Sequence, residues 1–193
     1  MQRTARLAGF ALLAACLAAP RPGHGLLYQG VNLPLSISAE GKTLKLQGAG
    51  LRKKFVFSVY VGALYLTVPT SDASAAVRAD EPKRISLTFL RDVDGPKMRE
   101  AFEEGFFKNS QGRLGALKSR IDAFLAIAAG DVKKGQELAF TYLPGEGVKV
   151  TLAGSPRGVV EGKDFMEAVW SIWLGEVPPG AELKKGMLGL AQP

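Results

Sequence analysis

The chain has 193 residues, a formal net charge of +7 and an apolar fraction of 47%. This length and composition fit one globular domain with a substantial core rather than two domains. No run of Lys and Arg is interleaved with aromatic residues, so nucleic-acid binding has little support.

The start of the chain has the order of a secretory signal. Arg3 and Arg6 precede an uncharged, apolar run at residues 7–19, and a proline closes that run. A membrane-spanning helix needs about 20 apolar residues, so this run is too short to be an anchor. We therefore predict that residues 1–25 are a signal peptide, that the protein is exported to the periplasm, and that residues 26–193 form one domain.

A lipid anchor is an alternative fate for the same segment. The sequence Leu-Ala-Ala-Cys that ends at Cys16 is similar to the lipobox of bacterial lipoproteins, in which residues 1–15 would be removed and Cys16 would carry a lipid. Ordinary cleavage near Ala19 or Gly25 is the other possibility. Contact with a membrane is predicted only through this lipid.

Cleavage after Gly25 would remove Cys16 and His24, which are the only cysteine and the only histidine of the chain. The mature domain would then have no disulfide, no zinc site built on Cys or His, no Cys nucleophile and no Ser-His-Asp triad. We predict no metal and no cofactor, and any chemistry must use Arg, Lys, Tyr, Asp, Glu or backbone groups.

The first half of the domain is predicted to be mainly β. Residues 43–47 alternate polar and apolar side chains between two glycines, which is the period of a half-buried strand. Residues 55–67 are rich in β-forming residues and apolar on both faces, which predicts a central buried strand or pair of strands. Residues 73–79 fit a short helix, and residues 84–90 alternate again.

The second half contains helices on both sides of a hairpin. Asp-Gly-Pro at residues 94–96 suits the start of a helix, because the aspartate can cap the first turn and the proline fits within it. The sequence Pro-Gly-Glu-Gly at residues 144–147 is a strong hairpin signal. The same periodicities predict the remaining elements: helices over 98–106, 114–128, 165–173 and 181–190, and strands over 137–142, 148–152 and 157–160. This order predicts an α+β fold, an antiparallel sheet with helices packed on one face.

Several segments carry a resemblance to a known family. Gly-Ala-Gly-Leu-Arg-Lys-Lys at residues 48–54 and Val-Tyr-Val-Gly-Ala-Leu-Tyr-Leu at residues 59–66 resemble the paired signature of the chalcone isomerase family. Residues 89–93, 142–147 and 172–175 resemble its secreted bacterial branch. The resemblance implies an open-faced sandwich, in which a ligand cleft lies between a large antiparallel sheet and the helices on one face.

The same resemblance implies two possible functions. Chalcone isomerases of plants close a chalcone to a flavanone, whereas fatty-acid-binding relatives hold a long-chain acid in the same cleft. The enzymes use an arginine after the glycine motif, and Arg52 matches it. Tyr60 falls where the enzymes have threonine and is similar to the tyrosine of the fatty-acid binders.

Three further positions differ from the enzymes. Met98 stands where they have tyrosine, Gly105 where they have asparagine, and Ile172 where they have threonine or serine. These changes remove the groups that would polarise a ketone and order water. The resulting apolar cleft suits an alkyl tail, while a guanidinium can hold a carboxylate through two charge-assisted hydrogen bonds. The residues predicted to bind the ligand are Arg52, Tyr60, Met98, Phe102, Gly105 and Ile172.

One geometric condition applies to the polar pair. Arg52 and Tyr60 are eight residues apart, so on one unbroken strand they would face the same side but lie about 26 Å from each other. Residues 53–59 contain no Gly, Pro or Asn to mark a turn. We therefore expect the two side chains to serve different parts of the cleft.

Three functions remain open from the sequence. The first is non-catalytic binding of a fatty acid or a similar small apolar acid or lipid. The second is an isomerase or intramolecular lyase that acts on an enone-like substrate. The third is a structural or partner-binding module of the envelope. The sequence does not indicate an oligomeric state.

Overall fold

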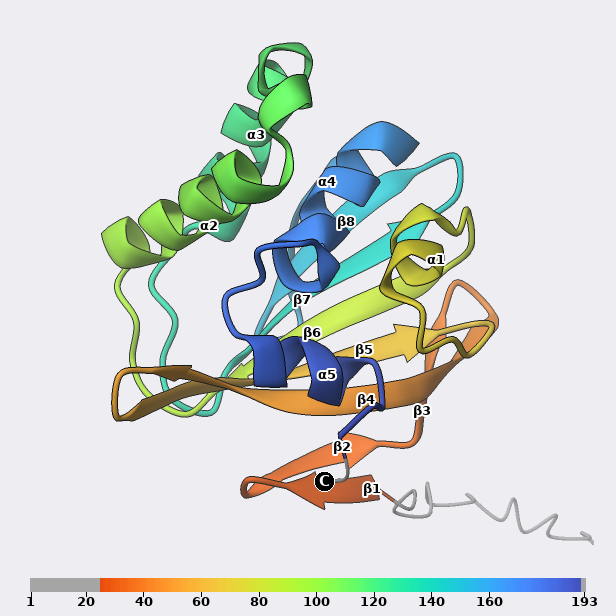
Figure 1. Cartoon of the computed structure of the whole chain (residues 1–193), viewed down its shortest axis with the longest axis vertical. Coiled ribbons are helices and arrows are strands. Elements are labelled where there is room, and N and C mark those ends of the chain that lie inside the picture. The colour runs from red at the N-terminus through yellow and green to blue at the C-terminus, as the bar shows by residue number, and fades with distance from the viewer. Residues whose placement is uncertain (1–24, 192–193) are drawn as a thin grey trace, which may run out of the picture.

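The computed structural model describes residues 25–191, so all of the predicted signal peptide except Gly25, and with it Cys16, lies outside the described residues. Seven strands form one antiparallel sheet in which each strand pairs with the next along the chain (Figure 1). In sheet order they are β3 (Ser36–Ala39), β4 (Lys42–Lys54), β5 (Phe57–Leu66), β6 (Lys83–Phe89), β7 (Glu137–Leu143), β8 (Gly147–Leu152) and β9 (Ser155–Val160).

Helices cover one face of this sheet, and the predicted α+β fold is confirmed. They are α1 (Ala73–Arg78), α2 (Gly95–Asn109), α3 (Leu114–Ala128), α4 (Lys163–Leu174) and α5 (Ala181–Met187), with a short 3₁₀ turn, η1 (Gln111–Arg113), before α3. The last helix is shorter than predicted. No helix in residues 25–191 has the length and apolar character needed to cross a membrane.

The core between helices and sheet is strongly aromatic. Phe102 of α2, Phe124 of α3, Phe140 of β7 and Trp173 of α4 are buried, and the five close pairs among them have ring centroids 5.3–6.3 Å apart. Asp94 caps α2 by accepting a hydrogen bond from the backbone N–H of Lys97 at 2.9 Å. The cap fixes where α2 begins, and its buried aromatic face then holds the helix over the sheet.

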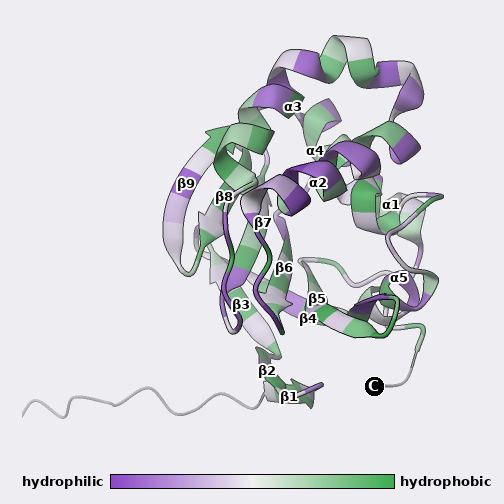
Figure 2. Cartoon of the chain, turned by 90° about the vertical axis from the view of Figure 1, so that its left-hand side faces the viewer, coloured by the Kyte–Doolittle hydropathy of each residue, from purple (hydrophilic) through white to green (hydrophobic). Residues whose placement is uncertain are grey.

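On the opposite face of the sheet, a hairpin that the sequence did not predict covers the part formed by β3, β4 and β5. Strands β1 (Gly25–Tyr28) and β2 (Val31–Pro34) pair with each other and lie below the sheet, away from the helices (Figures 1 and 2). Leu33 packs there with Val61 and Tyr65 of β5. Four-residue strands are too short to display a clear alternation, which is why this hairpin and β3 were missed.

Strand β4 is longer than the predicted strand over residues 43–47, because the glycines that follow it do not end it. A Cβ at Gly50 would lie 2.4 Å from the carbonyl oxygen of Leu183, and a Cβ at Gly48 would lie 2.2 Å from that of Gly186. The two glycines thus allow α5 to rest directly on the backbone of β4. This close contact fixes the part of β4 that leads into Arg52.

The β4–β5 hairpin corrects the predicted start of the central strand. Phe55 and Val56 form a two-residue turn, and β5 begins only at Phe57. Phe55 has φ +55°, in the left-handed region where glycine or asparagine is usual. A β-bulge at Val59 adjusts the register, so that Arg52 pairs with Tyr60 and Lys54 with Phe57.

Candidate functional site

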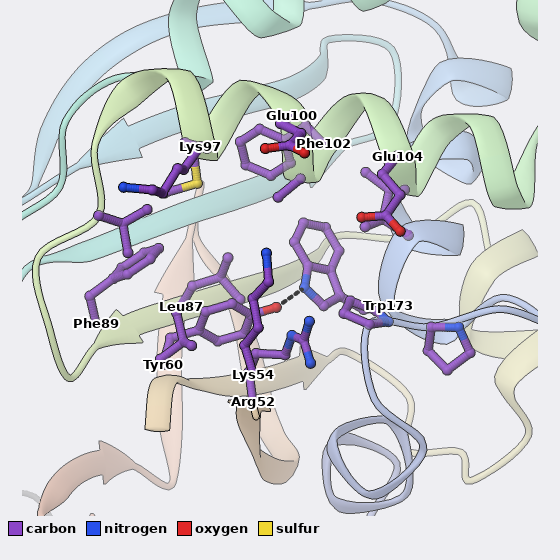
Figure 3. Close-up of a pocket in the computed structure, with 18 of the residues that line it drawn as sticks. Arg52, Lys54, Tyr60, Leu87, Phe89, Lys97, Glu100, Phe102, Glu104 and Trp173 are labelled. Atoms are coloured by element: carbon purple, nitrogen blue, oxygen red, sulfur yellow. Dashed lines mark hydrogen bonds between the residues drawn. The ribbon is translucent and has the colours of Figure 1, made fainter. Parts of the chain in front are cut away.

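A cavity of about 520 Å³ lies between the β4–β5 hairpin, β6, α2 and α4 (Figure 3). This volume is within the range of small-molecule sites, roughly 300–1,000 Å³. All six predicted ligand residues line it, although their role as ligand contacts stays a prediction. Its apolar lining comprises chiefly Val59, Leu87, Phe89, Val93, Met98, Phe102, Ile172 and Trp173.

The hairpin brings Arg52 and Tyr60 together, so the expectation that they serve different parts of the cleft was wrong. The two residues are direct partners across β4 and β5. Directly opposed Cα atoms in an antiparallel pair lie about 5 Å apart, and their side chains share one face. Figure 3 shows both side chains entering the cavity from the sheet. A single carboxylate can therefore reach both.

Trp173 was missed as a polar contributor to this site. Its Nε1–H donates a hydrogen bond to the Tyr60 hydroxyl oxygen at 3.0 Å (Figure 3). Within residues 25–191 that hydroxyl has no acceptor for its own proton, so it can donate one hydrogen bond into the cavity. The sequence could have indicated this residue by its position, because Trp173 directly follows the predicted ligand residue Ile172 in the apolar stripe that predicted this helix.

The protonation state of Tyr60 follows from its surroundings. Burial raises the pKa of Tyr60 to about 12, and this outweighs the hydrogen bond from Trp173 and the positive charge of Arg52, which both lower it. Tyr60 is therefore a neutral phenol at physiological pH. It can act as a hydrogen-bond donor to an anion but not as a phenolate base.

The Arg52 guanidinium has no carboxylate partner among the described residues. Its Nη1 donates to the backbone carbonyl of Lys53, and the side chain is only half-buried. Within residues 25–191 Arg52 thus lacks the ion pair that would give it a purely structural role. The remaining guanidinium donors are free for an anionic ligand.

Gly105 has a packing role in addition to its place in the cavity wall. A Cβ at this position would lie 2.7 Å from Cγ2 of Ile172. Helix α2 can therefore approach α4 only because the residue at position 105 has no side chain. Ile172 fills the space above it and is buried, like Met98 and Phe102.

Basic side chains outnumber acidic ones around the cavity mouth. Five basic and three acidic residues contribute: Arg52, Lys54, Arg91, Lys97 and Lys108 against Asp92, Glu100 and Glu104. A hydrogen bond from Lys108 lowers the pKa of Glu104, and the charges of Lys54 and Arg52 across the mouth add to this effect. The excess of positive charge favours entry of an anion.

A second buried polar group lies outside the cavity and has a structural explanation. Lys83 is almost fully buried, and its Nζ donates to the carbonyls of Ala76, Val77 and Ala79 at 2.8–2.9 Å. Burial lowers the pKa of Lys83 to about 7. The three carbonyls, at the negative end of α1, accept hydrogen bonds from all three ammonium N–H groups and favour the charged form. Lys83 therefore closes the end of α1.

No group of three or more His, Cys, Asp or Glu residues within 25–191 is arranged to hold a metal ion. The arrangement around the cavity can instead bind one anionic group at the Arg52–Tyr60 pair and enclose an apolar body against α2 and α4. The Arg52–Tyr60 pair stands beside apolar side chains of the sheet and of α2 and α4, and an amphipathic small molecule requires both kinds of surface.

Comparison with known proteins agrees with this architecture. No curated protein sequence matches the chain. The crystal structure of a fatty-acid binding protein from Arabidopsis thaliana is similar, with a TM-score of 0.66 and 17% sequence identity over 85% of this chain and 95% of that one. The family model described as chalcone isomerase-like matches residues 27–189. The resemblance seen in the sequence is thus confirmed, and the chain belongs to the chalcone isomerase-like family.

Proposed function

We propose that this protein binds a fatty acid, or a similar apolar acid, in the cavity between sheet and helices and does not transform it. The observation that carries the proposal is the polar pair at the cavity wall. Arg52 and Tyr60 stand side by side with unused donors, and the surface beyond them is apolar.

The donors suit a carboxylate. The planar guanidinium of Arg52 can give two parallel hydrogen bonds to the two oxygens, and the Tyr60 hydroxyl can give a third. Because Trp173 occupies a lone pair of the Tyr60 oxygen, the hydroxyl proton is directed elsewhere, toward the open cavity. The similar fold of a plant fatty-acid binding protein supports this ligand class.

The same residues argue against catalysis on a chalcone. Met98, Gly105 and Ile172 offer no side-chain hydrogen-bond donor, and Tyr60 stays neutral. A ketone oxygen that develops negative charge could meet donors of the sheet, such as Arg52 and the neutral Tyr60, but none from positions 98, 105 and 172 on the helices. Stabilisation of such charge usually depends on several preorganised donors.

We expect Arg52→Ala to weaken binding of myristate, the C14 acid, by about 10- to 100-fold, because one charge-assisted pair is lost. Methyl myristate, which lacks the negative charge, should bind the wild type with a similar loss. The two losses should not add, since each removes one partner of the same pair. Calorimetric titration of acid and ester into both proteins measures this cycle.

The matched control is Arg157→Ala, which removes an exposed arginine of β9 outside the cavity and should leave the affinity unchanged. Fully additive losses would reduce Arg52 to a structural residue. Chalcone turnover above the spontaneous rate that disappeared in Arg52→Ala would instead establish the isomerase.

The proposed place of action is the periplasm, with the protein exported by its first 25 residues. N-terminal sequencing of envelope protein should begin at or after Cys16. If Cys16 is lipidated, Cys16→Ser should move the protein from the membrane fraction to the soluble periplasmic fraction. An intact Met1 on cytoplasmic protein would contradict export.

A further inference from the structure

The tip of the β4–β5 hairpin exposes three consecutive apolar residues. Phe55 is 89% exposed, Val56 87% and Phe57 54%. In Figure 1 this turn lies at one edge of the molecule. Contiguous exposed apolar residues are typical of surfaces that contact a protein partner, a membrane or a ligand.

The turn contains Phe55 although its backbone conformation favours glycine or asparagine. The first central residue of a primed hairpin turn has a positive φ, and glycine or asparagine usually occupies it. Here Phe55 adopts φ +55°. A bulky residue in the left-handed region is strained, and a side chain that is 89% exposed gains little packing energy to offset the strain. Strain without a folding benefit points to a role for the exposed ring.

Basic side chains surround this apolar tip. Arg52 and Lys54 lie on the cavity face of β4, and Lys53, between them, lies on the other face, because side chains alternate along a strand. The guanidinium of Arg91 lies 4.7 Å from the ring centroid of Phe57. Within residues 25–191 none of these four basic residues forms a salt bridge. An exposed apolar tip surrounded by basic side chains complements an anionic phospholipid surface. Aromatic rings can enter the interface of such a surface, and cations can bind its headgroups.

We propose that the β4–β5 hairpin tip docks the protein on an anionic phospholipid bilayer, with Phe55 and Val56 inserted and Lys53, Lys54 and Arg91 on the headgroups, while Arg52 stays with the ligand in the cavity. The tip is also the lip of the cavity, since Lys54, Phe55 and Phe57 line it. Docking would therefore place the cavity mouth at the membrane surface. This inference builds on the proposed function, because a fatty acid that leaves a bilayer would enter the cavity along this hairpin.

The test compares two valines that flank β5. Val56 at the tip and Val68 beyond the far end are 87% and 60% exposed, and Val56 is not part of the cavity lining. On phosphatidylcholine vesicles with about one quarter phosphatidylglycerol, Val56→Asp should lower the partition coefficient at least about tenfold. Val68→Asp should stay within about twofold of the wild type. All proteins carry Cys16→Ser, so that no lipid anchor contributes, and co-sedimentation measures binding.

Two further variants separate the apolar and the electrostatic contributions. Lys53→Gln should weaken binding about fivefold on the anionic vesicles and have no effect on pure phosphatidylcholine. Phe55→Asn should weaken binding on both, yet leave the melting temperature unchanged or higher, because asparagine suits the positive φ. A lower melting temperature with unchanged vesicle binding would make Phe55 a folding residue and overturn the proposal.

Myristate binding in solution distinguishes this proposal from the proposed function. Val56→Asp, Val68→Asp and Lys53→Gln change residues outside the cavity and should bind myristate as the wild type does. If the wild type bound myristate but neither the anionic nor the pure phosphatidylcholine vesicles, membrane docking alone would be refuted. The exposed tip would then be a contact site for a protein partner. A wild type that binds vesicles but no fatty acid would refute the proposed function alone.

Discussion

Myristate should bind about three orders of magnitude more tightly than octanoate, the C8 acid. Each methylene buried from water contributes about 0.8 kcal/mol, which is close to fourfold in affinity, and six methylenes separate the two acids. The cavity has the apolar wall that such burial needs, from Leu87 and Phe89 of the sheet to Phe102 and Ile172 of the helices. Titration of a C8 to C18 series, each acid below its micelle concentration, measures the slope.

The series should also reveal a limit. If each heavy atom of the ligand occupies about 30 Å³, the liquid volume of one water, a cavity of about 520 Å³ holds roughly 17 such atoms. Myristate has nearly that number, so affinity should level off near C16. The C14 dicarboxylic acid is the control, because its second charge would enter the apolar end and should cost at least about 100-fold. Equal binding of both C14 acids would contradict a buried tail.

Much of the fold was accessible from the sequence because its elements are locally encoded. Helix α2 was predicted from its Asp94 cap and from the spacing of Met98, Phe102 and Phe106, and these three residues are buried in the structure. The β7–β8 hairpin was predicted from its Pro-Gly-Glu-Gly turn, and the two strands pair around that turn. A cap and a turn act through neighbouring residues, so a pattern within a few positions is enough.

The errors occurred where distant parts of the chain decide the structure. Gly48 was interpreted as the end of a strand, but it lies within β4 because α5, far along the chain, needs a bare backbone there. The turn at Phe55 and Val56 has none of the usual turn residues, so the sequence indicated one long strand. That error placed Arg52 far from Tyr60 on one strand, whereas in the hairpin the two residues are direct cross-strand partners. Trp173 was missed as a polar residue because its partner is a tyrosine on another element.

The contact between β4 and α5 also connects the stability of the domain to the candidate site. Leu183 and Met187 of α5 are buried against β4 and β5, and the segment before α5 lines the cavity through Val177, Pro178 and Pro179. The amide group of Asn109, at the end of α2, exchanges two hydrogen bonds with the backbone of Val177. A shift of α5 would therefore move one wall of the cavity.

Gly50→Ala should produce that shift and reduce the free energy of unfolding by about 3 kcal/mol, near the upper end of overpacking effects. Its Cβ would lie within 3 Å of three backbone atoms of Leu183, the nearest at 2.4 Å, and backbone cannot rotate away as a side chain can. For a domain of this size the melting temperature should fall by roughly 6–12 °C. Thermal and urea unfolding, followed by circular dichroism, measure the change.

The matched control for Gly50→Ala is Gly115→Ala. Gly115 lies in α3 with no atom within 4 Å of an added Cβ, so alanine should raise stability by about 0.5–1 kcal/mol through helix propensity. Gly50→Ala should also weaken myristate binding, even at temperatures where the protein remains folded. Val177 and the two prolines directly precede α5 and would move with it. If Gly50→Ala and Gly115→Ala changed stability alike, α5 would be loosely attached and the glycines of β4 would need another explanation. If Gly50→Ala lost stability but kept its affinity, the cavity wall before α5 would not contact the ligand.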